Sequence, residues 1–160
     1  MVFLLFQLGS GRYALEASRV VEVVPLLEMK PLPQAPRGVA GIFNYRGRPV
    51  PAVDLSALTL GQPASERLST RIIIVHCPDE SGNDHLLGLI AEHATELLHK
   101  EPSAFIDSGV KLSRAPYLGP ILMGPPGPIQ WIYEQRLLPE AVRNVLFAET
   151  VVSQLPDGPA

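Results

Sequence analysis

Short apolar stretches separated by glycine and proline run along most of the chain. Such stretches, rich in β-branched and aromatic residues, are typical of β-strands joined by tight turns. Gly and Pro account for 30 of the 160 residues, against roughly 12% in an average protein, so long helices are not expected to dominate. The pattern predicts a mainly β protein with strands at residues 3–8, 12–15, 20–24, 38–45, 49–53, 71–76, 85–91, 95–99, 118–123 and 129–133.

Two features of these strands bear on how they pair. Residues 46–48 connect two strands and are expected to form a hairpin turn, with Asn44 placed to bond backbone groups of that turn. Pro49 and Pro51 stand at alternate positions of the returning strand, so both lack an amide donor on the same side. We therefore expect that strand to lie at a sheet edge or beside a β-bulge.

Helix is expected at two places. Residues 55–60 form a helical turn, for which Asp54 is the expected N-cap. Near the C-terminus, Pro139 suits the first turn of a helix, and Val142 and Val145 follow helical spacing.

The predicted strands divide into two similar sets of hairpins at the polar loop that begins at Gly61. A chain of 160 residues and 17.4 kDa has the length of one domain. We predict a single domain over residues 1–150, made of two small barrels that share a core. A flexible tail is expected over residues 151–160.

Charge and hydropathy exclude several classes of partner. The 13 Lys and Arg residues are outnumbered by 16 Asp and Glu, and the net charge of −3 leaves no basic surplus for nucleic acid. No apolar run approaches the ~20 residues of a membrane-spanning helix, and no secretory signal is visible. The single cysteine, Cys77, ends an apolar run and is expected to be buried, in agreement with a reducing cytoplasm.

The residue types that carry catalysis form no recognisable motif. His76, Cys77, Asp79 and His85 are metal-ligand types, but the chain has no C-x-x-C or H-x-x-x-H pair. It also lacks the G-x-S-x-G pattern of a nucleophile elbow. The sequence therefore predicts no catalytic residue, no metal site and no cofactor.

Recognition of another polypeptide remains, and the predicted hairpin tip is its main candidate. Arg46 and Arg48 flank Gly47 there, and an arginine on a rigid turn offers a fixed fork of donors to a carboxylate. The alternative is that both are solvated turn cations. If the strand at residues 20–24 alternates regularly, Val20 and Glu22 share a partly exposed face, which suits a partner but is also found on ordinary strands.

Four segments of the chain share their pattern with one known family. They are FLLFQLGSGRYAL at residues 3–15, VVEVV at 20–24, NYRGRPVPAVDL at 44–55 and LLGLIAEHATELL at 86–98. The third is the most specific, because it is close to N-L-R-G-x-x-x-P-x-x-D-L. On these segments, from residue 3 to residue 147, the chain resembles the CheW family of chemotaxis coupling proteins.

The resemblance implies a fold and a function. The fold is mainly β, with two small five-stranded SH3-like β-barrels on a shared core, which agrees with the count of hairpins and is followed by the C-terminal helix. The implied function is that of a non-catalytic adaptor in the cytoplasm, associated with membrane-bound chemoreceptor arrays. Its partners are the helical hairpin at the chemoreceptor cytoplasmic tip and the regulatory domain of a CheA-type histidine kinase.

The resemblance also carries over a set of site residues by position. The implied receptor-binding residues are Arg46, Glu22, Val20, Gly41 and Leu98. The structural residues of the motif are Asn44, Gly47, Pro51 and Asp54. Contact between barrel ends would account for apolar residues in predicted loops, namely Leu26, Leu27, Met29 and Leu60.

Departures from the family pattern are concentrated in the second half. Tyr45 replaces a leucine and Pro49 is an additional proline, whereas Tyr133, Trp131 and the stiff segment at 124–128 all lie late in the chain. Contacts made by the second half are therefore expected to be altered. One alternative interpretation is an adaptor of a non-flagellar pathway that controls pili or cyclic-di-GMP, and another is an unrecognised enzyme on a small barrel.

Overall fold

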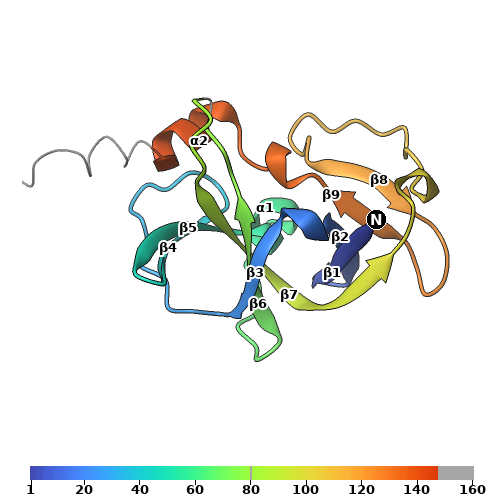
Figure 1. Ribbon diagram of the computed structural model, residues 1–160, viewed down its shortest axis with the longest axis horizontal. Helices are drawn as coiled ribbons and strands as arrows, with labels where there is room; N and C mark the ends of the chain where they lie inside the picture. The colour runs from blue at the N-terminus through green and yellow to red at the C-terminus, as the bar shows by residue number, and fades with distance from the viewer. Residues whose placement is uncertain (80, 148–160) are drawn as a thin grey trace, which may run out of the picture.

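The computed structural model describes residues 1–79 and 81–147, and this part of the chain contains nine strands (Figure 1). The strands are β1 (Val2–Leu8), β2 (Gly11–Glu16), β3 (Val20–Pro25), β4 (Val39–Tyr45), β5 (Arg48–Asp54), β6 (Thr70–His76), β7 (Leu86–His99), β8 (Leu118–Leu122) and β9 (Ile129–Ile132). The helices are α1 (Leu55–Leu60) and α2 (Glu140–Phe147), and the 3-10 turns are η1 (Ala17–Arg19), η2 (Pro102–Ala104) and η3 (Glu134–Arg136). The tail predicted at residues 151–160 lies outside the described residues.

The long strand β7 connects two barrels. Its first half pairs with β6 and β5, and its second half pairs with β1. At His93 the backbone φ is 52°, and the register between β7 and β1 shifts between Leu5 and Gln7, so a bulge bends β7 between the two halves. The prediction of separate strands at 85–91 and 95–99 is therefore wrong, because the polar interruption is a bulge within one strand.

Pairing with β7 produces two barrels of five strands. The first contains β3, β4, β5, β6 and the first half of β7, and the second contains β1, β2, β8, β9 and the second half of β7. Figure 1 shows β4 and β5 at one side of the molecule and β8 and β9 at the other. The predicted mainly β fold of two five-stranded barrels, with a C-terminal helix, is confirmed.

A shared core lies between the barrels. Buried side chains from both barrels and from α2 form its cluster, including Phe6, Leu15, Ile73, Leu89 and Leu146. Each side chain of this size stabilises the fold by about 1.5–3 kcal/mol on full burial. No helix in the described residues is long and apolar enough to cross a membrane.

The strand β5 is an edge strand over only part of its length. Residues 48–51 pair with β4 alone, whereas Ala52 and Val53 also pair in parallel with β7. Pro49 and Pro51 therefore fall in the part of β5 that has one neighbouring strand, where a missing amide costs no ladder hydrogen bond. The edge prediction is confirmed for the prolines, whereas Val53 has two neighbouring strands and lies beside the bulge in β4, the other alternative of that prediction.

Candidate partner-binding site at the β4–β5 hairpin

Arg46 and Gly47 form a two-residue turn between β4 and β5. Their φ angles are 53° and 82°, and positive φ at both central residues is the requirement of a type I′ hairpin turn. The left-handed conformation costs a non-glycine residue roughly 1–2 kcal/mol. Asn44 supports the turn, as the sequence predicts, because its Oδ1 accepts a hydrogen bond of 2.7 Å from the Gly47 amide.

The Arg46 side chain bonds to Glu22 on β3. Arg46 Nη2 donates to Glu22 Oε1 over 2.9 Å, and the Tyr45 hydroxyl donates to the same oxygen over 2.5 Å. The Arg46 guanidinium carbon also lies 5.3 Å from the centroid of the Tyr45 ring. The hydrogen bond to the carboxylate, followed by burial, raises the pKa of Tyr45 because both stabilise the protonated phenol.

These contacts orient Arg46 and leave most of it accessible. The side chain of Arg46 is 74% exposed and that of Glu22 is 36% exposed, so the ion pair itself contributes at most about 1 kcal/mol. A guanidinium carries five N–H donors, and among residues 1–79 and 81–147 it donates one side-chain hydrogen bond, to Glu22. The remaining donors are available to an acceptor on another molecule.

A β-bulge at Val21 separates Val20 from Glu22. Val20 pairs with Val75 and packs on the shared core, whereas Glu22 pairs with Ile74, on the other face of β6. The prediction that Val20 and Glu22 share a face is therefore wrong. The extra residue in β3 interrupts the period-two alternation on which that prediction rested.

Gly41 lies buried at a second bulge, in β4 opposite β5. Its φ is 149°, and a Cβ at this position would overlap the carbonyl oxygen of Lys30. The close approach arises because Lys30 and Ile42 exchange two backbone hydrogen bonds, of 2.8 and 2.9 Å. Gly41 thus lets the connector after β3 pair against β4.

The remaining residues of the predicted set lie away from the turn. Leu98 belongs to the second half of β7, where it pairs with Phe3 and packs on the core of the second barrel. Asp54 caps α1 as predicted, since its Oδ1 accepts from the Ala57 amide over 3.1 Å and its Oδ2 from the Ala64 amide over 2.9 Å. The structure therefore brings Arg46 and Glu22 into contact but places Leu98 on the other barrel.

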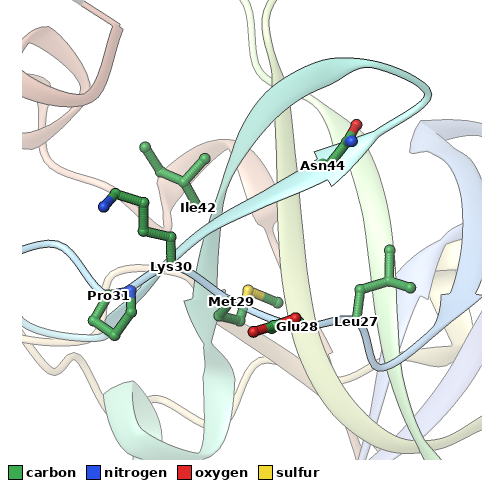
Figure 2. Close-up of a pocket in the computed structure, with 7 residues that line it drawn as sticks. All are labelled: Leu27, Glu28, Met29, Lys30, Pro31, Ile42 and Asn44. Atoms are coloured by element: carbon green, nitrogen blue, oxygen red, sulfur yellow. The ribbon is translucent and has the colours of Figure 1, made fainter.

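An open groove of about 600 Å³ adjoins the hairpin (Figure 2). Figure 2 shows Ile42 and Asn44 on β4, beside the connector that carries the remaining lining residues. Its apolar part is supplied by Leu27, Met29, Pro31 and Ile42, of which Leu27 is 37% exposed. Because Asn44 contributes to both the groove and the turn, the two features form one continuous surface at this end of the first barrel.

Tyr45 is a site residue that the sequence pattern does not predict. In the sequence Tyr45 stands out only as a substitution for leucine, and its bond to Glu22 depends on the end of β4 coming close to β3 in the fold. The one feature of the sequence that could have indicated a role for Tyr45 is its position next to the predicted turn. As for metals, the described residues contain no group of three His, Cys, Asp or Glu side chains able to hold an ion.

Comparison with known proteins identifies the family. The family profile described as CheW-like domain matches residues 2–123. The chain belongs to the CheW-like domain family. The match includes the hairpin with Arg46, the residue Glu22 that binds it and the groove beside them.

Individual relatives agree with this assignment. Proteins named "Chemotaxis protein CheW" from Treponema pallidum, Rhizobium meliloti and Helicobacter pylori are 40%, 30% and 29% identical over 31%, 58% and 60% of this chain. The matched parts span 29%, 57% and 55% of those relatives. The scaffolding protein TtCheW of Thermoanaerobacter tengcongensis has a similar fold, with a TM-score of 0.74, 24% identity and coverage of 86% of this chain and 87% of that chain.

Proposed function

We propose that this chain is a non-catalytic adaptor that couples chemoreceptors to a CheA-type histidine kinase in a cytoplasmic chemosensory array. Membership of the CheW-like domain family is the observation that carries the proposal. The three relatives described above are named chemotaxis proteins, which favours chemotaxis over pilus control or cyclic-di-GMP synthesis as the output.

The receptor side of the proposal concerns the hairpin tip. The free donors of Arg46 suit a side-chain carboxylate or a carbonyl oxygen on the helical hairpin at the tip of a chemoreceptor. Glu22 and Tyr45 hold the guanidinium in place, which lowers the entropy lost on binding. Gly41 acts by maintaining the backbone beside the turn. Val20 and Leu98 pack on the barrel cores away from the turn, so the contact with Arg46 does not require them.

The kinase side of the proposal concerns the groove. Leu27 and Met29 offer an apolar strip at the end of the first barrel, of the kind that buries well against the end of another barrel. Such a contact is weak when alone. In an array, each weak contact is strengthened because neighbouring contacts keep the partners at high effective concentration.

A binding experiment tests both sides. The purified chain is passed over an immobilised receptor cytoplasmic fragment and, separately, over the regulatory domain of a CheA-type kinase. We expect Arg46→Glu no longer to bind the receptor fragment but still to bind the kinase domain. Its melting temperature is expected to equal that of the unaltered chain. Arg48→Glu, two positions away and outside the contact with Glu22, is the matched control.

Two results would contradict the proposal. If the unaltered chain retains neither partner, the adaptor function is wrong. If Arg46→Glu melts early or Arg48→Glu is equally impaired, Arg46 has no specific role in receptor binding.

A further inference from the structure

A second groove, of about 650 Å³, opens on the second barrel. The chain between η2 and β8 forms one wall and supplies Val110 and Leu112, which are 66% and 54% exposed. Tyr133 and Arg136, at η3, contribute to the other wall. The groove belongs to the half of the chain that departs most from the family pattern, and neither the hairpin tip nor the first groove contributes to it.

Arg136 is held in place by aromatic stacking. Its guanidinium carbon lies 4.7 Å from the centroid of the Tyr133 ring, and that ring lies 5.3 Å from Trp131. Gly119 makes room for the stack, since a Cβ there would come within 2.6 Å of Tyr133 Cε2. Stacking uses the flat face of the guanidinium and leaves its edge of N–H donors for a planar acceptor such as a carboxylate.

The charges of the groove are unbalanced. Lys111 and Arg136 line it, and within residues 1–79 and 81–147 neither is paired with a carboxylate. Asp107 also lines it and keeps its negative charge, but its Oδ1 accepts the Gly109 amide over 2.9 Å and no ion pair in the described part of the chain joins it to either cation, so positive charge is in excess. The groove thus combines an exposed apolar wall with two unpaired cations.

We propose that this groove binds an acidic amphipathic segment of a partner protein. A carboxylate of the segment lies against the edge of Arg136, a second is close to Lys111, and its apolar side chains cover Val110 and Leu112. A protein segment is favoured over nucleic acid because the chain as a whole carries a net charge of −3. The concave shape and the exposed apolar wall favour it over a simple anion. This binding is independent of the contact proposed for Arg46.

The only tryptophan of the chain provides the readout, because the Trp131 ring lies 5.3 Å from the ring of Tyr133, which lines the groove. Its fluorescence is measured while the full chain is titrated with a synthetic 18-residue helical peptide that carries Leu on one face and Glu on the other. A peptide with Lys in place of Glu is the matched probe. We expect the Glu peptide to bind and the Lys peptide not to bind.

Variants assign the binding to the groove. Arg136→Glu is expected to weaken the Glu peptide at least about ten-fold, as follows from losing a charge-assisted hydrogen bond. Arg136→Lys keeps the charge but not the planar fork of donors. Its affinity for the Glu peptide is expected to lie between that of the unaltered chain and that of Arg136→Glu. Arg114→Glu changes an exposed cation of the same loop that does not line the groove and leaves binding unchanged.

Each other outcome overturns the inference. Equal binding of both peptides would show a merely apolar surface, and no binding, or equal losses in Arg136→Glu and Arg114→Glu, would remove the site. A concentration-dependent change of Trp131 fluorescence without peptide would show that a second copy of the chain occupies the groove. Arg46→Glu is expected to bind the Glu peptide as tightly as the unaltered chain does. The proposal for this groove can therefore fail or succeed independently of the proposal that Arg46 contacts the receptor.

Discussion

The side chains of Arg46 and Glu22 are 2.9 Å apart and join the tip of the β4–β5 hairpin to a strand 24 residues earlier in the chain. The bond is possible because Arg46 adopts a positive φ in the turn and because β3 and β4 meet at this end of the first barrel. With both side chains partly exposed, the pair serves more to orient the guanidinium than to stabilise the fold.

A double-mutant cycle checks that interpretation. We expect Arg46→Ala, Glu22→Ala and the double variant to give a coupling free energy of about 0.2–1 kcal/mol in urea unfolding, the range of exposed ion pairs. Tyr45→Phe removes the second bond to Glu22 and should loosen Arg46 without changing the charge. A coupling above about 2 kcal/mol would contradict this and make the pair a structural element.

Replacing Gly41 is expected to damage the fold more than replacing Gly47. Alanine at Gly47, where φ is 82° and the space is open, should cost roughly 1–2 kcal/mol of conformational strain. Alanine at Gly41 adds overlap with the Lys30 carbonyl and should exceed the loss at Gly47 by about 1–3 kcal/mol. Urea midpoints with unchanged m-values measure both losses. Equal losses of unfolding free energy for the two variants would contradict this, because they would show that the connector after β3 moves aside at little energetic cost.

The buried carboxyl of Glu134 predicts a dependence of stability on pH. Burial raises the pKa of Glu134 above its ordinary value of 4.5, and Arg19, 3.6 Å away, lowers it only in part. The folded state therefore holds this proton more tightly than the unfolded state. The stability that the protonated form contributes is fully present below pH 4.5 and is lost as the pH rises through the folded-state pKa.

The comparison uses Glu134→Gln, which cannot ionise. Its free energy of unfolding is expected to increase relative to that of the unaltered chain as the pH rises from 4.5, within the window set by the raised pKa. Arg19→Ala should move this window to higher pH, because the charge that favours the carboxylate is gone. A difference between Glu134→Gln and the unaltered chain that does not vary with pH would show that Glu134 does not titrate in this way.

Local features account for what could be predicted of the fold and the site. The turn at Arg46 and Gly47, its support by Asn44 and the cap at Asp54 depend on residues within three positions of one another. Backbone conformation and short-range hydrogen bonds dominate there, so neighbouring residues decide the outcome. Strand positions could likewise be predicted from the alternation of apolar residues.

The order of residues is enough to specify a mainly β chain, the place of its hairpins and an arginine on a tight turn. Contacts between distant segments settle the rest: Val21 is an extra residue in β3, β7 continues through His93, and Tyr45 and Arg136 take part in polar surfaces. This is so because a bulge or a stacked side chain is selected by the partner strand or ring, which lies far away in the chain. A local pattern of residues contains no information on which partner that will be.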